Sequence, residues 1–157
     1  RTVILRPATV CGVSPRLRLD VSVNLLTYQA FKKKEITVLG GKQVRPNIHI
    51  DDMISLYDFV LKKKNLRGIY NAGFENISIL DIAKKIKKSI NCKIKIKPSN
   101  DPRSYRLDSS KIIAKGFKPK KNVELGIAEL LKYFNLKNYK LSTSNVNLKL
   151  MNKIKVK

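Results

Sequence analysis

Residues 40–52 read G-G-K-Q-V-R-P-N-I-H-I-D-D and carry the strongest local signals in the chain. The two glycines favour a tight turn, because glycine tolerates backbone angles that other residues avoid. Arg45 then precedes Pro46, which pushes the arginine towards an extended conformation. A guanidinium on ordered backbone suits a phosphate or carboxylate ligand. The alternative is a plain hairpin in which Arg45 is only solvated.

The second part of this stretch predicts a strand followed by a helix. Residues 48–50 alternate apolar and polar side chains, which is typical of a half-buried strand. Asp51 or Asp52 could cap a helix that begins at Met53. The apolar spacing of that helix predicts that one face is buried, formed by Met53, Leu56, Tyr57, Val60 and Leu61.

Strand and helix signals alternate outward from this stretch, and this alternation predicts an α/β protein. A helix from Ser78 has the clearest apolar stripe, and Ser78 with Asp81 has the spacing of a capping box. Asn122 is expected to cap a later helix. No firm pattern follows residue 139. The other expected strands lie at 2–5, 8–11, 36–39, 68–73 and 93–97, and the other expected helices at 21–34 and 108–115.

The chain is strongly basic, with 34 Lys+Arg against 11 Asp+Glu and a formal net charge of +23 in 157 residues. Because the lysines are spread over many segments and aromatic residues make up only 7%, we interpret the charge as mostly solvated surface. A basic domain that binds nucleic acid or another polyanion is the alternative.

Two features bear on where the protein works. Cys11 and Cys92 have no metal or disulfide spacing, so we expect isolated buried thiols and a reducing cytoplasm. No apolar run approaches the ~20 residues that span a bilayer, and no membrane association is expected. The chain opens on Arg1 within an apparent strand, from which we expect further residues upstream.

Candidate binding residues are polar side chains near turns. His49, the one histidine, lies between two isoleucines and is interpreted as a packed core residue; no metal-ligand cluster is expected. Loops on a scaffold are where ligand contacts concentrate. The candidates are Thr9, Asn24, Arg45, Asp101, Arg103 and Tyr105.

The order of these residues resembles the extended short-chain dehydrogenase/reductase family, the NAD-dependent nucleotide-sugar epimerases and dehydratases. The matching pieces are ILRPATVCG at 4–12, SPRLRLDVSVNLL at 14–26, LGGKQVRPNIHIDD at 39–52, IYNAG at 69–73 and DPRSYRLDSSKI at 101–112. They resemble the C-terminal half of the family. The resemblance implies the C-terminal part of a Rossmann-type doubly wound domain plus a smaller mixed α/β substrate-binding domain.

The resemblance also implies roles for individual residues. Pro7, Ala8 and Thr9 would lie near the cofactor, which is NAD or NADP. Asn24, with Leu25 beside it, and Arg45 would hold the substrate diphosphate. Asp101, Arg103 and Tyr105 would belong to the substrate loop, where Arg103 is the candidate to replace an arginine that the family often carries at the place of Pro98.

The catalytic segments of the family do not occur in this sequence. The glycine-rich dinucleotide turn is absent, and Tyr28 with Lys32 has the spacing of the catalytic Tyr-x-x-x-Lys pair in the wrong segment. We therefore expect a substrate-binding portion that is inactive alone. An N-terminal half, in cis or in trans, would bind most of the cofactor, and the intact enzyme would be a homodimer. A catalytically inactive relative is a further alternative.

The resemblance divides the chain into domains. Residues 1–12 and 46–74 would supply the last strands and a helix of the dinucleotide-binding domain. Residues 13–45 and 75–139 would form the substrate-binding domain. Residues 140–157 would be a basic tail, a candidate for disorder.

Overall fold

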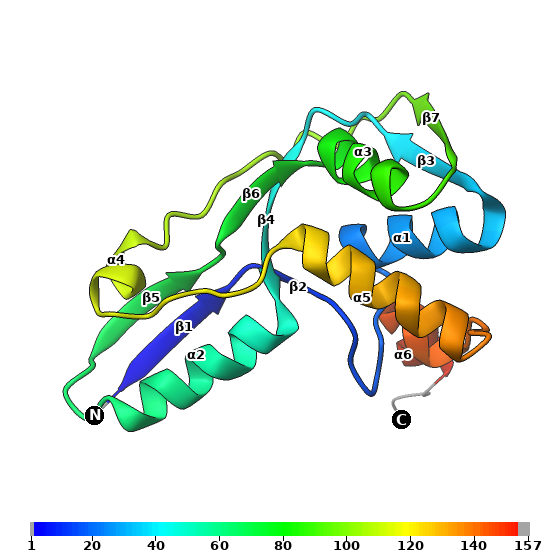
Figure 1. Ribbon diagram of the computed structural model, residues 1–157. Coiled ribbons are helices and arrows are strands. Elements are labelled where there is room, and N and C mark those ends of the chain that lie inside the picture. Colours follow the sequence, from blue (N-terminus) through cyan, green and yellow to red (C-terminus); the bar gives the residue numbers. More distant parts are fainter. Residues whose placement is uncertain (1, 154–157) are drawn as a thin grey trace.

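The computed structural model describes residues 2–153 and has a mixed α/β architecture with three small sheets (Figure 1). Two sheets are parallel pairs and the third, between them, has three strands. β1 (Val3–Pro7) pairs with β5 (Gly68–Ala72), and β3 (Glu35–Leu39) pairs with β7 (Lys93–Lys97). β4 (Val44–His49) pairs in parallel with β2 (Thr9–Cys11) and antiparallel with β6 (Glu75–Ser78).

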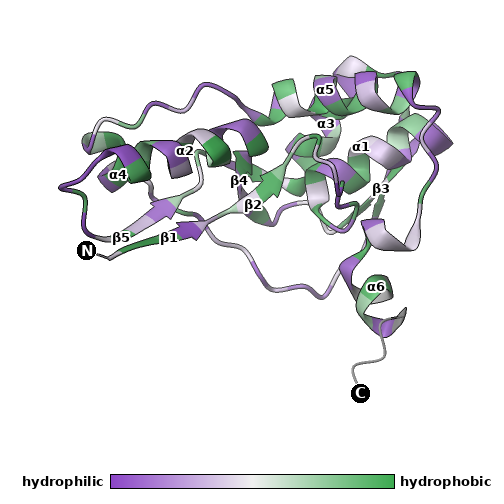
Figure 2. Cartoon of the chain, turned by 90° about the horizontal axis from the view of Figure 1, so that it is seen from below, coloured by the Kyte–Doolittle hydropathy of each residue, from purple (hydrophilic) through white to green (hydrophobic). Residues whose placement is uncertain are grey.

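The helices gather in two groups, which Figures 1 and 2 show at opposite ends of the molecule. α1 (Ser22–Lys33), α3 (Ile79–Ser89) and α5 (Val123–Leu136) lie at the end that holds β3. α2 (Ile50–Lys62) and α4 (Ser110–Ala114) lie with β1 and β5. A 3-10 helix, η1 (Thr143–Asn145), and α6 (Asn147–Lys153) follow α5. None of the helices in the described part of the chain is long and apolar enough to cross a bilayer.

Two hydrophobic clusters correspond to these two groups. The first joins α1, α3 and α5 through fully buried side chains such as Val23, Ile82 and Ile127. The second packs α2 and β5 around Leu56 and Tyr70. Ile112 and Phe117, which the sequence assigned to the substrate-binding domain, pack in the second cluster. The two clusters correspond roughly to the two domains expected from sequence. The domain division itself stays a prediction.

The glycine turn forms, but it does not close a hairpin. Gly40 and Gly41 have φ angles of 72° and 101°, which favour glycine over other residues. β3 before the turn pairs with β7, and β4 after it pairs with β2 and β6. The turn therefore connects two different sheets, and Arg45 lies on β4, just after this turn.

The start of α2 differs from the expectation. His49 is the N-cap, its Nδ1 accepts from the Asp51 N–H at 3.2 Å, and the helix begins at Ile50. Asp52 instead accepts from the backbone N–H groups of Lys120 and Lys121, each at 2.9 Å. The Asp52 carboxylate therefore binds the segment before α5 and does not cap α2. Sequence spacing does not show that this segment lies beside Asp52.

The outer face of α2 also differs from the expectation. Met53 and Leu56 are buried, whereas Tyr57 and Leu61 are exposed. Together with Ile54 they form an apolar helix face that no described residue covers.

The two later cap predictions are confirmed, because Ser78 Oγ accepts from the Asp81 N–H and Asn122 Oδ1 accepts from the Leu125 N–H.

Part of the region expected to be a tail has regular secondary structure. Residues 143–153 form η1 and α6, and Asn145 is buried against the loop before α1. Hydrogen bonds of Asn145 and Asn147 connect this segment to the loop before α1, and periodicity does not detect such contacts. Residues 154–157 of the predicted tail lie outside the described residues.

Candidate functional site

A cavity of about 460 Å³ lies where α1, β3, β4 and the loop before α4 meet. Its walls come from segments that are far apart in sequence, because the glycine turn and the crossovers between sheets bring them together. Six of the predicted residues line it. They are Thr9, Leu25, Arg45, Asp101, Arg103 and Tyr105.

Arg45 is held in the wall of this cavity, with a side chain that is 14% exposed. Its Nη2 donates to Asp101 Oδ2 at 3.1 Å, and its Nη1 donates to the carbonyl oxygens of Val44 and Arg103. The guanidinium carbon lies 5.6 Å from the centre of the Tyr105 ring. The alternative of a merely solvated Arg45 is therefore wrong, since its guanidinium is oriented before any ligand arrives.

Asp101 connects the two arginines of the site. Its carboxylate accepts from Arg103 Nε at 2.7 Å and Arg103 Nη2 at 2.9 Å, in addition to its bond from Arg45. The hydrogen bonds from Arg103, followed by the nearby charges of Arg103 and Arg45, lower the pKa of Asp101 to about 2. The carboxylate is thus ionised at neutral pH and offsets one of the two positive charges, which leaves the group cationic.

The N-terminus of α1 faces the same cavity. Its N-cap residue, Val21, offers no side-chain acceptor, and the first turn contains no acidic residue. Val21, Ser22 and Leu25 all line the cavity. Uncapped N–H groups and the helix dipole make such an end attractive to anions. Sequence reasoning missed this feature; the nearest acidic residue, Asp20, does not cap α1, because its carboxylate binds Arg18 and the Asn147 N–H.

The Asn24 side chain is bonded to backbone, and its predicted contact with a diphosphate stays a prediction. It is 3% exposed, its Oδ1 accepts from the Gly12 N–H at 3.1 Å, and its Nδ2 donates to the Arg18 carbonyl at 2.9 Å. Its side chain therefore fixes the loop between β2 and α1. An asparagine inside an apolar stretch of helix is unfavourable without a partner, and here the partners are backbone groups.

A second cavity of about 530 Å³ adjoins the first and shares Thr9 and Val21 with it. Pro7, Ala8 and Asn24 line this second cavity. The three residues predicted to lie near a cofactor, Pro7 to Thr9, thus share one wall, at the step from β1 to β2. Their predicted role stays a prediction.

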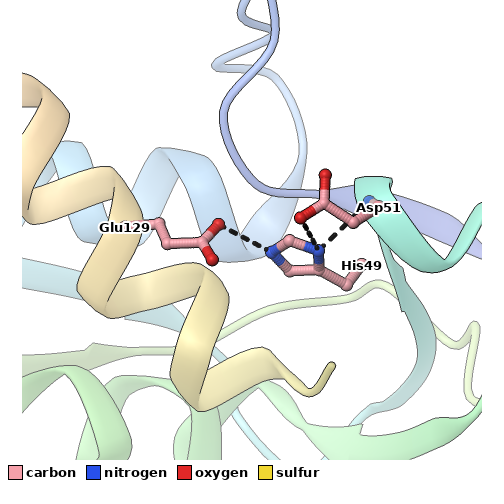
Figure 3. Close-up of side chains that lie close together, drawn as sticks. All are labelled: His49, Asp51 and Glu129. Atoms are coloured by element: carbon pink, nitrogen blue, oxygen red, sulfur yellow. Dashed lines mark hydrogen bonds and ion pairs between the residues drawn. The ribbon is translucent and has the colours of Figure 1, made fainter. Parts of the chain in front are cut away.

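His49, Asp51 and Glu129 form a polar group away from the cavity (Figure 3). Because His49 Nδ1 accepts a backbone N–H, its Nε2 is the nitrogen that can donate to Glu129 Oε2, 3.0 Å away. Lys121 Nζ lies 2.7 Å from Glu129 and 3.6 Å from Asp51. With an ammonium group already on both carboxylates, this arrangement is an ion-pair network that joins α2 to α5, and it does not favour a metal ion.

Comparison with known proteins agrees with the resemblance seen in the sequence. The model of the NAD dependent epimerase/dehydratase family matches residues 1–73. A dTDP-D-glucose 4,6-dehydratase of Dictyostelium discoideum is 41% identical over 66 residues, which cover 41% of this chain and 14% of that protein. The first part of the chain is therefore similar in sequence to NAD-dependent nucleotide-sugar epimerases and dehydratases.

Solved structures extend the similarity over most of the chain. UDP-glucuronic acid 4-epimerase from Bacillus cereus, in complex with UDP-glucuronic acid and NAD, has 31% identity and a TM-score of 0.72 over 87% of this chain. The dTDP-glucose 4,6-dehydratase from Bacillus anthracis, in complex with NAD, shares the fold with a TM-score of 0.72 over 85% of the chain at 22% identity. The chain spans 46% and 44% of these two proteins.

Proposed function

We propose that this chain is the substrate-binding portion of an NAD-dependent enzyme that epimerises or dehydrates a nucleotide-diphosphate sugar. The observation that carries the proposal is the meeting of the uncapped α1 N-terminus with Arg45 and Arg103 in one cavity. The 31% identity to an epimerase solved with UDP-glucuronic acid supports this ligand class.

The chemistry of the cavity suits a diphosphate. Arg45 presents a fixed guanidinium, and backbone N–H groups at the start of α1 add donors that need no reorientation. Binding energy from the diphosphate, which does not react, would hold the sugar in place for chemistry elsewhere. Tyr105 and Leu25 add partly exposed apolar surface that a base or sugar could cover.

The cofactor would lie beside the second cavity. Pro7, Ala8 and Thr9 are small and can approach a flat ring closely, so they fit one wall of a nicotinamide pocket. Bound NAD or NADP would accept and return a hydride at a sugar carbon. Because the sequence contains no glycine-rich dinucleotide turn, we propose that another polypeptide segment, in cis or in trans, supplies the rest of the cofactor site and the catalytic pair.

The open faces of the second cluster support the need for such a segment. Ile4 on β1 and Ile69 on β5 are 47% and 40% exposed, and the face of α2 with Ile54, Tyr57 and Leu61 is also open. Exposed apolar groups of this extent mark interaction surfaces. Absence of hydrophobic-dye binding by the isolated chain would count against this part of the proposal.

Assembly as a homodimer and a cytoplasmic location also remain proposals. The two cysteines are free and buried, and burial raises the pKa of Cys11 to about 12, so this thiol is unreactive. Unpaired thiols of this kind are usual in a reducing compartment.

Calorimetric titration of the full chain with UDP-glucuronic acid tests the proposed function. We expect saturable binding that Arg45→Ala weakens by roughly 100-fold, because charge-assisted hydrogen bonds are lost. Arg67→Ala, at the opposite end of the molecule, is the matched control and should bind as the wild type does. Equal binding by the wild type and Arg45→Ala would overturn the proposal, and tighter binding to a DNA duplex would favour the polyanion alternative.

A further inference from the structure

The loop between β2 and α1 sets the position of the anion-attracting helix end. Residues 16–20 have no regular secondary structure. Leu17 and Leu19 are buried in the first hydrophobic cluster, while Asp20 and Val21 border the cavity. Asn24 holds this loop from the inside through the Arg18 carbonyl at 2.9 Å. The position of the first turn of α1 therefore depends on how firmly this loop is held.

A second set of contacts holds the same loop from the outside. Residues 142–147, which we name the clasp, lie against it although more than a hundred residues separate them in sequence. The Leu19 N–H donates to the Asn145 carbonyl at 2.7 Å, and Asn145 Nδ2 donates to the Leu17 carbonyl at 2.8 Å. Figure 1 shows the loop running from β2 beside α6, which directly follows the clasp.

Asn147 adds two further bonds at the edge of the cavity. Arg16 Nη2 donates to its Oδ1 at 2.6 Å, and its own N–H donates to Asp20 Oδ2 at 2.9 Å. The Asp20 carboxylate accepts from Arg18 as well, at 2.9 Å. Asp20 is thereby turned to the clasp and the loop, and it is not available to cap the N–H groups of α1.

Asn145 is the centre of the clasp. It is 5% exposed, its Oδ1 accepts from the Ser142 N–H at 2.7 Å, and its Nδ2 also donates to the Tyr139 hydroxyl at 2.5 Å. Tyr139 packs on Tyr28 of α1 and Phe134 of α5. One amide thus ties the loop to the aromatic contacts between two helices.

We propose that Asn145 is a positioning residue of the nucleotide-sugar pocket, which acts by fixing the Leu17–Asp20 loop and with it the open N-terminus of α1. The proposal rests on the proposed function above. Holding the loop before the ligand arrives removes an ordering cost from binding, so affinity depends on a residue that contacts no ligand. Asn145 lines neither of the two adjoining cavities, so it acts on the pocket through the loop that it binds.

The test compares Asn145→Ala with Tyr139→Phe in the full chain. Both changes remove a hydrogen bond of the Asn145 side chain, but only the first releases the Leu17 carbonyl. We expect Asn145→Ala to weaken UDP-glucuronic acid binding roughly tenfold, measured well below the unfolding temperature, and Tyr139→Phe to bind within about twofold of the wild type. Equal affinity of Asn145→Ala and the wild type overturns the proposal, as does an equal loss in both variants.

Amide hydrogen exchange gives a readout that needs no ligand. Asn145→Ala should exchange faster at residues 17–24 than the wild type, with unchanged rates in α2 at the far end. Faster exchange throughout the chain would indicate general destabilisation and overturn the positioning role. If Asn145→Ala does not fold, Asn147→Ala replaces it, because this change removes only the acceptor for Arg16; exchange unchanged at residues 16–20 in that variant contradicts the proposal.

The two readouts separate the inference from the proposed function. If the wild type binds the nucleotide sugar and Asn145→Ala binds equally well, the clasp has no positioning role and the proposed function stands. If the wild type does not bind but exchange at residues 17–24 responds to Asn145→Ala, the proposed function fails and the clasp still fixes the loop.

Discussion

Two cavities at opposite ends of the molecule use positive charge in different ways. The candidate site, of about 460 Å³, has an open helix N-terminus, two arginines and the carboxylate of Asp101 between them. The other cavity, of about 550 Å³, is lined by Lys62, Lys63, Lys64, Arg67 and Lys115 and lies at the C-terminus of α2.

The basic residues of the cavity at the C-terminus of α2 have a structural explanation. Cations at a helix C-terminus are attracted by its exposed carbonyl groups and by the negative end of the helix dipole. Lys63 Nζ donates to the Lys115 carbonyl and lies 5.0 Å from the centre of the Phe59 ring, and Lys62 pairs with Asp58 at 2.7 Å. The comparison teaches that a count of positive charges does not locate an anion site. We propose that the polarity of the helix end beside these charges locates the anion site.

After Arg45→Ala, the largest expected effect comes from placing a negative charge at the open helix end. Ser22→Asp should weaken UDP-glucuronic acid binding by roughly 30-fold, because the new carboxylate would face the diphosphate. The same change should raise the free energy of unfolding by about 0.5 kcal/mol, since an acidic group in the first turn favours the helix dipole. Calorimetry and urea unfolding measure the two quantities. A parallel loss of affinity and stability would contradict this explanation.

A smaller effect should follow from Arg45→Lys. The charge is kept, but the planar fork that binds Asp101 and the carbonyl of Val44 is lost. We expect roughly a tenfold loss of affinity for the nucleotide sugar, weaker than that of Arg45→Ala, in the same titration. Wild-type affinity in Arg45→Lys would mean that charge alone is recognised and that the fork has no role.

At the opposite end, Lys62→Glu should change stability and leave binding unaltered. The substitution breaks the pair with Asp58 and puts a negative charge at the C-terminus of α2. We expect a loss of about 0.5–1 kcal/mol in the free energy of unfolding. A lower affinity for UDP-glucuronic acid in Lys62→Glu would contradict the claim that the cavity at the C-terminus of α2 takes no part in binding.

The smallest effect concerns pH. The bonds from Arg103 lower the pKa of Asp101 to about 2, so the native state favours its ionised form. A carboxylate with a lowered pKa contributes its stabilisation above its ordinary value near 3.8 and loses it as the pH falls through about 2. An NMR titration of the Asp101 side-chain carbon should therefore show a midpoint near 2. A midpoint near 3.8 would show that Arg103 does not hold the carboxylate.

Much of the fold followed from local patterns in the sequence. The helix that buries Val23, Leu26 and Ala30 and the one capped by Ser78 were predictable, because periodicity and capping are properties of neighbouring residues. The strand at 93–97 was also predictable from its alternation, but its two faces are not distinct, because Ile96 is exposed as well as the lysines. The prediction that Tyr57 and Leu61 are buried was wrong. Spacing identifies an apolar helix face, but it does not show whether another element covers that face.

Arg45, Asp101 and Tyr105, three of the residues predicted to bind substrate, line one cavity. Their roles in binding stay predictions. The clasp could not be foreseen, because its contacts join positions such as Leu17 and Asn145 that no local pattern links. The N-terminus of α1 is uncapped because the Asp20 carboxylate binds the Asn147 N–H, a tertiary contact that local sequence does not show.

Chemical-shift mapping by NMR tests the central claim most directly. On titration with UDP-glucuronic acid, the account predicts the largest changes at the backbone amides of residues 22–24 and at the guanidinium of Arg45. Residues 62–67 at the other basic cavity should not change. Shifts at residues 62–67 without shifts at Arg45 and the start of α1 would contradict it.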